Sequence, residues 1–371
     1  MSPNDIARLR LIRSENIGPI TYHKLVRRYG NAQAVLDHLP EIARKAGKKS
    51  LRICSVEAAQ KELKQMAAYG ATALFCDDPD YPAALAATAD APPFLALMGD
   101  RSLLQRPMVA IVGARNASAA GMQYATHLAQ GLGRAGYVVV SGMALGIDGA
   151  AHKGALAHGT VAVLAHGIDK LYPRQHEQLK ADIAAQGLLV TEMPFGQDPR
   201  ERDFLRRNRI IAGLALGIVV MDAAEKSGSL HTARMAHDYG REVMAVPGAP
   251  YDARARGTNA LIREGARLVQ SVDDIIDELQ NPNDFVRSRD LDYRTTHPSP
   301  EPAEEPSDEM RARFCQLLGY APTPLDELMR HSGLSPMMVQ AILIDLELAG
   351  LIHWDAGGPV LAFNPDAKSD A

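Results

Sequence analysis

Cysteine, tryptophan and long apolar runs are scarce in this sequence. Only Cys54, Cys76 and Cys315 occur in 371 residues, and they form neither a C-x-x-C pair nor a cluster with histidine. This spacing excludes a disulfide framework and a zinc site. The most apolar run, residues 210–221, is 12 residues long, whereas a membrane helix needs about 20. The start also lacks the apolar stretch of a secretory signal, so we expect a cytoplasmic chain that binds no metal and no membrane.

Charge is nearly balanced over the whole chain but not along it. The formal net charge is −4. Residues 1–76 nevertheless hold 13 Lys and Arg against 6 Asp and Glu, a net of +7, and residues 308–371 hold 4 against 9, a net of −5. The nearly neutral total therefore hides a basic N-terminal end, and nucleic acid stays open as a partner.

The first 76 residues have the pattern of short helices. Apolar residues recur at helical spacing, with breaks at Gly18-Pro19 and Gly30. The "NIGP" turn is typical of a helix-hairpin-helix or SAM-like bundle, in which turn amides meet a phosphate. Gly-Pro turns also occur in any helical domain, so a plain helical bundle explains the pattern as well.

Residues 77–285 alternate short apolar runs with segments of helical length. The runs are "MVAIVG", "YVVVSG", "TVAVLA", "LLVTEM", "GIVVMDA" and "EVMAVPG". Continuous apolar runs are typical of parallel strands covered on both faces. The pattern predicts an α/β fold with an extended, Rossmann-like, doubly wound parallel sheet.

The remaining residues predict a linker and a small third domain. Residues 286–307 include "HPSPEPAEEPSD", a Pro- and Glu-rich run that cannot bury a core. In residues 308–371 we expect helices, the last with Ser335 as N-cap, and then a hairpin around Gly357-Gly358. This order is typical of a winged helix. Residues 336–348 contain no Lys or Arg, which argues against a duplex-reading helix.

Small and polar residues follow almost every predicted strand, as in "GARNAS", "SGMALGIDGAAH" and "DAAEKSGSLHTA". Glycine and serine let backbone amides approach a ligand closely, and helix N-termini add partial positive charge. Ligands of doubly wound sheets bind beyond the carboxyl ends of the strands. These loops therefore predict a shelf for phosphates.

The loop in "VAIVGARNASAAG" indicates which phosphate ligand to expect. A dinucleotide site has G-x-G-x-x-G and an acidic residue about 20 positions later. Here Arg115 stands at the second glycine, and residues 123–142 contain no Asp or Glu. A chain of phosphates needs more cations than one nucleotide does. The cations near strand ends are Arg115, Arg174, Arg200, Arg202, Arg206, Arg207 and Arg209.

No catalytic residue and no cofactor are predicted. The sequence has no G-x-S-x-G elbow, no H-E-x-x-H and no P-loop. Asp148 and His152 lie one helical turn apart, a spacing that suits acid–base work but more often orders a loop. "SGS" at 227–229 is compatible with a phosphate loop and also with a simple helix cap.

Six ordered blocks resemble the DNA-processing protein A (DprA/Smf) family. They are "VAIVGAR", "SGMALGIDGAAHKGAL", "VAVLAHGIDKLYP", "RRNRIIAGLALGIVVMDAAEKSGSLHTA", "REVMAVPG" and "GTNALIREGA". The resemblance implies a single-stranded DNA-binding protein of natural transformation and recombination that protects incoming strands and loads the RecA recombinase. It also implies a homodimer without enzymatic activity.

The resemblance also implies where DNA is bound. The family's phosphate pocket is built from the glycine loops and basic residues of the extended Rossmann domain. The matching positions here are Gly113, Arg115, Ser141, Gly142, Gly146, Arg174, Arg207, Asn208, Arg209, Ser227, Gly228 and Ser229.

Four positions depart from the family pattern. Leu145 replaces a usual arginine, His166 stands where glycine or threonine is common, Leu205 replaces the proline of "FP-x-RNR", and His231 replaces an aliphatic residue. The missing cation at position 145 is expected to reshape the pocket without abolishing it.

Two other functions stay open. The same class of sheet includes nucleotide phosphoribohydrolases, whose glycine-rich turn places a glutamate beside the sugar; "SGSLHTARMA" has no acid, which favours binding over hydrolysis. A scaffold for DNA uptake that never touches the strand is the other alternative.

Overall fold

The computed structural model describes residues 2–45, 51–280, 306–319, 321–355 and 357–361. The chain divides into two compact units, Met1–Gln60 with Tyr293–Ala371, and Lys61–Asp292. Residues 286–305 of the expected linker lie outside the described residues. Within the described ranges, no helix is long and apolar enough to span a bilayer, and no group of His, Cys, Asp and Glu is arranged to hold a metal ion.

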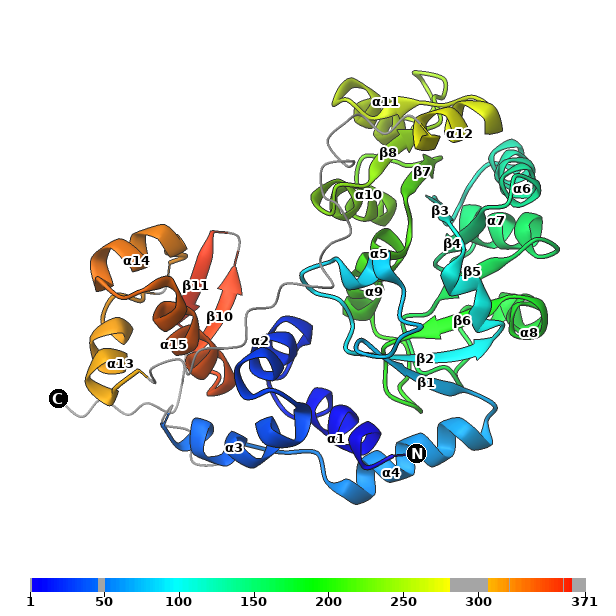
Figure 1. The fold of residues 1–371 in the computed structure, drawn as a ribbon. Coiled ribbons are helices and arrows are strands. Elements are labelled where there is room, and N and C mark those ends of the chain that lie inside the picture. The colour runs from blue at the N-terminus through cyan, green and yellow to red at the C-terminus, as the bar shows by residue number, and fades with distance from the viewer. Residues whose placement is uncertain (1, 46–50, 281–305, 320, 356, 362–371) are drawn as a thin grey trace. The chain divides into compact units, whose positions relative to one another are not determined.

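The larger unit is built on a nine-stranded sheet (Figure 1). Its strand order is β1-β2-β6-β5-β4-β3-β7-β8-β9. The strands are β1 Thr72–Phe75, β2 Phe94–Gly99, β3 Met108–Gly113, β4 Val138–Ser141, β5 Thr160–Val163, β6 Leu188–Thr191, β7 Gly217–Met221, β8 Glu242–Ala245 and β9 Arg267–Leu268. The six predicted runs form β3 to β8, which are parallel, and this confirms the doubly wound α/β core.

The sheet also contains strands that the sequence pattern did not predict. β1 lies in a segment expected to be helical, and it pairs antiparallel with β2, which in turn pairs antiparallel with β6. β9 extends the parallel part beyond β8. The sheet is therefore mixed rather than wholly parallel. These strands lie toward its two ends, where pairing with a neighbour decides the conformation more than apolar content does.

Helices cover both faces of the sheet. The helices of this unit are α5 Ala83–Ala86, α6 Ala119–Arg134, α7 Ile147–Ala155, α8 Glu177–Gln186, α9 Glu201–Leu214, α10 Gly228–Asp238, α11 Arg256–Arg263 and α12 Val272–Gln280, with 3-10 turns η1 Arg101–Gln105 and η2 Arg174–His176. Helix α4 Val56–Ala68 includes the boundary between the two units at residue 60. One core packs α9 and α10 on the sheet, and the other packs α6, α7 and α12 on the opposite face. α6 begins at the N-cap Ser118 and buries Leu128 and Leu132, as its apolar spacing predicts.

The smaller unit joins the N-terminal helices to the winged helix. Its elements are α1 Pro3–Ile12, α2 Pro19–Tyr29, α3 Ala32–Lys45, α13 Asp308–Cys315, α14 Leu325–Ser332, α15 Pro336–Leu348, β10 Ile352–Asp355 and β11 Gly358–Leu361. α15 begins at the predicted N-cap, where the Ser335 hydroxyl accepts from the Met338 amide. The predicted hairpin is present, since β10 and β11 pair antiparallel. Three helices and a two-stranded wing confirm the winged-helix prediction.

α15 buries one of its two acidic residues within this unit. The Asp345 carboxylate is buried and accepts from the Arg311 guanidinium at 3.0 Å, and the Arg28 guanidinium of α2 lies 3.5 Å away. The Asn16 side chain donates to the Leu348 carbonyl at 3.0 Å. The winged helix therefore uses α15 to contact the basic N-terminal helices of its own chain.

Candidate nucleic-acid interface

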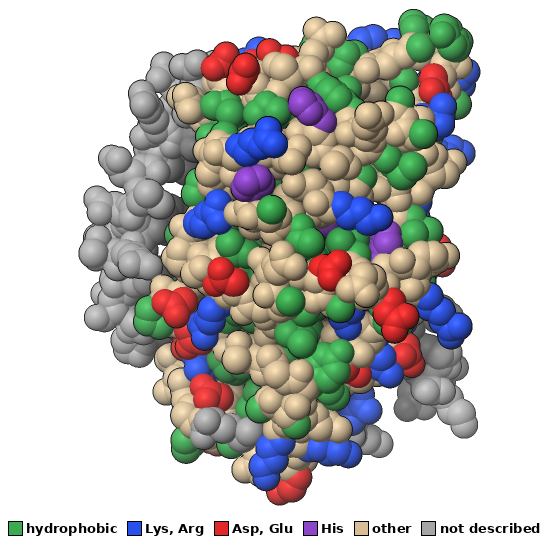
Figure 2. All heavy atoms as spheres, turned by 90° about the vertical axis from the view of Figure 1, so that its right-hand side faces the viewer, with side chains coloured by type: hydrophobic (Ala, Val, Ile, Leu, Met, Phe, Trp, Pro, Cys, Tyr) green, Lys and Arg blue, Asp and Glu red, His purple; other side chains and the backbone are tan. Residues whose placement is uncertain are grey.

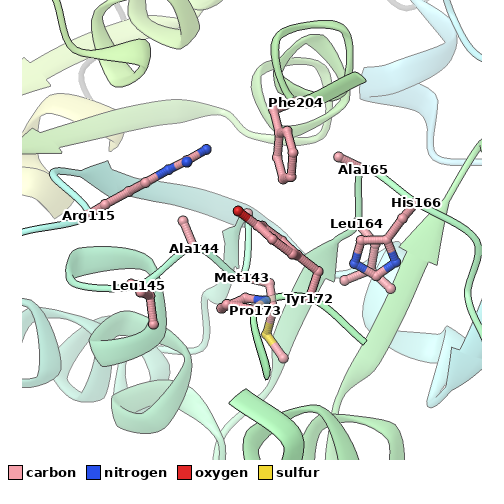
Figure 3. Close-up of a pocket in the computed structure, with 11 residues that line it drawn as sticks. Arg115, Met143, Ala144, Leu145, Leu164, Ala165, His166, Tyr172, Pro173 and Phe204 are labelled. Atoms are coloured by element: carbon pink, nitrogen blue, oxygen red, sulfur yellow. The ribbon is translucent and has the colours of Figure 1, made fainter. Parts of the chain in front are cut away.

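A pocket lies beyond the carboxyl ends of β3, β4 and β5 (Figure 3). Its walls are the loops after these strands together with one turn of α9. They are lined by Arg115, Gly142, Met143, Ala144, Leu145, Leu164, Ala165, His166, Tyr172, Pro173 and Phe204. This is the edge at which a doubly wound sheet binds its ligands.

Two aromatic side chains and one arginine converge in this pocket. The Tyr172 and Phe204 ring centroids are 5.2 Å apart with the rings tilted by 52°. The Arg115 guanidinium lies over the Phe204 ring, 5.2 Å from its centroid, and Figure 3 shows it extending toward that ring from the β3 loop. Arg115 is exposed, so its charge stays available to a ligand. Aromatic faces beside a cation bind bases and backbone phosphates together.

The turn after β4 is held by a buried carboxylate. Asp148, in the first turn of α7, accepts from the backbone amides of Gly142 at 3.1 Å and Ala144 at 3.3 Å. Burial raises the pKa of this carboxyl, while Arg207 and the amide hydrogen bonds act in the opposite direction. Asp148 therefore orders the loop that forms one wall of the pocket. Of the two roles that the spacing of Asp148 and His152 allowed, these contacts fit loop ordering rather than acid–base work.

Arg207 was predicted to contact phosphate, but the structure places it inside the protein. Its side chain is only 4% exposed and donates to the carbonyl oxygens of Gly142 and Val163. Burial lowers the pKa of Arg207 to about 10, while nearby Asp148 opposes that shift. The guanidinium ties the ends of β4 and β5 to α9 and has no exposed face for DNA.

Arg209 is also turned inward. Its guanidinium donates to the buried Glu192 carboxylate at 2.5 Å and to the Asp90 carbonyl. Arg206 is half exposed but pairs with the same Glu192 at 3.4 Å. These contacts anchor α9 to the loops around it. Arg207 and Arg209 therefore support the loops around the pocket. Of the four predicted cations, Arg115, Arg174, Arg207 and Arg209, Arg115 is the one that lines the pocket.

Three other predicted positions shape the backbone. A Cβ at Gly113 would lie 2.2 Å from the Met221 carbonyl oxygen, and one at Gly142 would lie 2.3 Å from Arg207. Gly146 has φ +76°, and a Cβ there would lie 2.2 Å from the Ala114 carbonyl oxygen. The glycines are required because three loops crowd together at this edge.

Ser141 is fully buried, and its hydroxyl donates to the Ile111 carbonyl at 2.6 Å. That hydroxyl faces the core between β3 and β4 and has no free direction toward the pocket. Ser141 thus stabilises the strand ends. Its role as a phosphate ligand stays a prediction, because its hydroxyl already donates inside the core.

The predicted serine loop caps α10. Ser227 is the N-cap, its hydroxyl lies 2.7 Å from that of Ser229, and Gly228 between them is exposed. The Asn208 side chain reaches this loop from α9, with Nδ2 3.5 Å from the Gly228 carbonyl oxygen. This loop extends the row of glycine- and serine-rich loops from the pocket to the end of β7. An N-terminus with an exposed glycine suits an anion, and a cap explains the serines equally well.

Exposed cations flank the pocket on its α8 and α9 sides. Arg174 begins η2, directly after two pocket residues, and Arg200 precedes α9. Both are exposed, and neither makes an ion pair within the described part of the chain. Arg202 is exposed too, with its guanidinium 3.8 Å from Asp203. Together with Arg115, these side chains give the mouth of the pocket a positive rim.

The four departures from the family pattern fall at different depths. Leu145 and His166 line the pocket, so the family's usual cation is replaced by an apolar wall. The His166 ring nitrogen Nδ1 lies 2.9 Å from the Gly167 carbonyl oxygen, and burial lowers the pKa of this imidazole. Leu205 is 49% exposed on α9, and His231 is half buried on α10.

Tyr172 and Phe204 form the centre of the pocket, and the sequence motifs did not identify them. They are 32 positions apart and meet only because the loop after β5 folds against α9. The available signal was an aromatic residue next to arginines in both "LYPR" and "RDFLRRNR". Aromatic residues interleaved with cations are typical of single-strand binders.

His152 lies fully buried behind the pocket as a neutral imidazole. The Thr160 hydroxyl donates to the Val139 carbonyl at 2.9 Å, so it accepts from Nδ1 of His152 at 2.7 Å. Within the described residues Nε2 has no hydrogen-bond partner. Burial therefore lowers the pKa of His152 to about 3, and His176 and Arg207 act in the same direction.

This buried imidazole should make the fold sensitive to acid. The pKa is about 3 when folded and about 6.5 when unfolded. As the pH falls below 6.5, only the unfolded chain takes up the proton, so stability falls. We expect a loss of about 2 kcal/mol between pH 7 and pH 5, measured by urea unfolding. His152→Gln should remove that part of the slope, and His127→Gln, at an exposed site, should not. An unchanged slope in His152→Gln would contradict the assignment.

Comparisons with known proteins agree with the fold and the motifs. The family model "DNA recombination-mediator protein A" matches residues 72–280. Models of a DprA-like N-terminal HHH domain and a DprA winged helix domain match residues 3–65 and 298–358. The match to the HHH domain favours the helix-hairpin-helix interpretation of the N-terminal segment over a plain bundle.

Individual relatives cover most of the chain. Protein Smf of Synechocystis is 35% identical over 308 residues, 76% of this chain and 77% of its own. DNA processing protein DprA of Bacillus subtilis is 43% identical over 55% of this chain and 69% of its own. The solved structure of DprA from Streptococcus pneumoniae has a TM-score of 0.63 and 34% identity, over 75% of this chain and 98% of that one. The sheet, its flanking domains and these matches together place the chain in the DNA-processing protein A (DprA/Smf) family.

Proposed function

We propose that this chain binds single-stranded DNA along the carboxyl ends of its sheet strands. The observation that carries the proposal is the grouping of Arg115, Phe204 and Tyr172 at the mouth of the pocket. The aromatic faces would stack on bases, and the guanidinium would neutralise a backbone phosphate. The glycine loops after β3, β4 and β7 let the strand lie close to backbone amides.

Unpaired bases fit this surface better than a duplex. Stacking on Phe204 or Tyr172 needs a base whose face is free, which a duplex does not offer. Figure 2 shows that the face covered by α6, α7 and α8 carries acidic and basic side chains interspersed, rather than a broad basic surface. α15, the helix that would enter a major groove in a winged-helix reader, contains no Lys or Arg.

A solved relative supports the same ligand. DNA processing protein A from Helicobacter pylori, whose structure is described by its single-stranded DNA binding mode, is 31% identical to this chain with a TM-score of 0.52. The match covers 57% of this chain and 96% of that one. We infer that the binding edge of the sheet is the shared part.

The proposed role in the cell is to protect incoming strands and to load RecA on them, as a homodimer and without enzymatic activity. Family membership supports this role. The exposed edge strand β9, with Leu268 half exposed, is available for a second copy. The test is RecA-dependent ATP hydrolysis on oligothymidine covered by a single-strand-binding protein. Addition of this chain should raise the rate, and sedimentation should give twice the monomer mass.

The test of strand binding is fluorescence anisotropy with labelled oligothymidine and a duplex of equal length. We expect the single strand to bind at least tenfold more tightly, with an affinity that falls as salt rises. Equal affinity for both would overturn the proposal, and no binding of either would favour a scaffold without strand contact. Incubation with nucleoside monophosphates checks the alternative enzyme, since base release would identify a phosphoribohydrolase.

Removal of the winged helix should leave strand binding nearly unchanged. In a chain that ends at residue 300 the sheet unit keeps every pocket residue, whereas α15 and its buried Asp345 are lost. We expect the affinity for oligothymidine to stay within about threefold of the full chain by anisotropy. A tenfold loss, about 1.4 kcal/mol, would mean that the winged helix contributes to binding.

A further inference from the structure

Tyr251 is far more exposed than a side chain that packs in a hydrophobic core. It lies in the loop between β8 and α11 with 89% of its surface exposed. The next most exposed large apolar residue within the described ranges is Met337, at 66%. Aromatic residues make up only 5% of the chain, and most of the tyrosines in the described ranges are at least half buried. A single exposed apolar residue is common on a protein surface, so the case for a contact rests on what surrounds Tyr251.

Hydrogen bonds hold the loop that carries Tyr251. The Asn259 side chain bridges it, accepting from the Gly248 amide at 3.2 Å and donating to the Gly248 carbonyl at 2.9 Å. Asp252, beside the tyrosine, is neutralised by a hydrogen-bonded ion pair with Arg254 at 2.9 Å. The ring is thus held out by a fixed backbone, which lowers the entropy lost when it binds a partner.

This loop continues the candidate interface. The sheet order places β3, β7 and β8 side by side, and α11 lies beside β8 (Figure 1). The amide of Gly257, in α11, donates to the Ala223 carbonyl of the β7 loop at 2.7 Å. A Cβ at Gly257 would lie 2.6 Å from the same oxygen, so the two loops are closely joined. In the sheet order, four strand spacings, about 19 Å, separate the end of β5, whose loop carries Tyr172, from the end of β8.

A cation lies between the pocket and the tyrosine. Lys226, in the β7 loop next to Ser227, is exposed and makes no ion pair within the described residues. Arg256, at the start of α11, is exposed and makes none there either. Glu225 and Asp222 are acidic neighbours, and Asp222 accepts from Ser118 of the β3 loop. Arg115, Lys226 and Arg256 against these two acids still leave a net charge of +1 along the path.

We propose that Tyr251 is a second base-stacking platform, and that the single strand runs from the pocket, past Lys226, to the end of β8. This inference rests on the proposed function, because it extends the same binding edge. At a rise of about 3.4 Å per stacked nucleotide, the roughly 19 Å between the ends of β5 and β8 corresponds to about six nucleotides. An oligonucleotide held only in the pocket would not reach the tyrosine, whereas a longer one would.

The experiment compares oligothymidines of 4 and 15 nucleotides on the full chain by anisotropy. Tyr251→Ala should weaken binding of the 15-mer about tenfold and leave the 4-mer unchanged, while Tyr251→Phe should bind both like the wild type. The dependence of affinity on salt should keep its slope in Tyr251→Ala, because no charge is removed. Lys226→Ala should make that slope shallower for the 15-mer.

A control separates this inference from the proposed function. Leu216→Ala removes a half-exposed apolar side chain just before β7, at the opposite edge of the sheet, and should change neither affinity. If the wild type binds oligothymidine and Tyr251→Ala binds both lengths equally well, the platform is refuted while strand binding stands. If Tyr251→Ala instead changes the sedimentation mass at unchanged DNA affinity, the ring contacts a second copy, which also refutes the platform. If the wild type binds no strand, the proposed function itself fails.

Discussion

Replacing Arg207 with methionine should destabilise the protein by about 3–5 kcal/mol. The substitution removes the guanidinium that holds the Gly142 and Val163 carbonyls and leaves the Asp148 carboxylate buried without its cation. Such a loss is a large fraction of the stability of a typical domain. Urea unfolding followed by circular dichroism measures it, and a drop in DNA binding should appear only to the extent that the protein is unfolded.

The neighbouring arginine is the matched control. Arg206 lies on the same helix, is half exposed and makes a single ion pair with Glu192. Arg206→Met should therefore cost no more than about 1 kcal/mol. If Arg207→Met kept the stability of the wild type but lost affinity for oligothymidine, Arg207 would contact DNA, as its motif suggested, and its structural role would be refuted.

Replacing Phe204 with alanine should cause the largest loss of strand affinity. Its ring is the one surface that both Tyr172 and Arg115 contact, so its removal takes away a stacking face and the support of the guanidinium. Stacking on an aromatic side chain contributes about 1–3 kcal/mol per base, so we expect a loss of roughly 5- to 150-fold. Anisotropy with oligothymidine at constant salt measures it.

Two further variants on α9 show whether the loss comes from the missing aromatic face. Phe204→Trp keeps an aromatic face and should recover most of the affinity. Leu205→Ala removes an exposed apolar side chain one position further along and should have little effect. An alanine variant at position 204 that unfolds like the wild type and binds like it would remove Phe204 from the interface.

The central sheet could be predicted because its strands are buried on both faces. Parallel strands covered by helices need continuous apolar residues, and β3 to β8 have them. β1 and β9 could not be predicted, because they consist of four and two residues whose conformation depends on one neighbouring strand. Residues 77–285 as one domain, and residues 308–371 as another, remain expectations.

The roles of individual arginines could not be predicted from the motif. Adjacent residues on a helix point about 100° apart, so "RRNR" on α9 places one side chain outside and the next inside. The sequence shows only four polar residues in a row, and it cannot distinguish a side chain that contacts phosphate from one that is buried and holds backbone carbonyls. The structure separates them, since Arg206 is half exposed and Arg207 and Arg209 are buried.

Arg115 differs from these residues because no carboxylate of the described residues pairs with its charge. It is exposed, lines the pocket and rests on an aromatic ring rather than on a carboxylate. The missing second glycine of the nucleotide loop is therefore the position where this sheet presents a cation to a ligand. A dinucleotide site would also need an acid about 20 residues later to hold the ribose, and residues 123–142 contain no Asp or Glu.

The most direct test is the affinity of the wild type and Arg115→Ala for oligothymidine, measured between 50 and 200 mM salt. If the strand's phosphates meet Arg115, the wild type should bind more weakly as salt rises. The variant should bind more weakly at every salt concentration, with a slope shallower by about 0.7 in log affinity against log salt. Equal affinity of the two proteins at low and high salt would contradict the assignment of this edge of the sheet as the DNA-binding site.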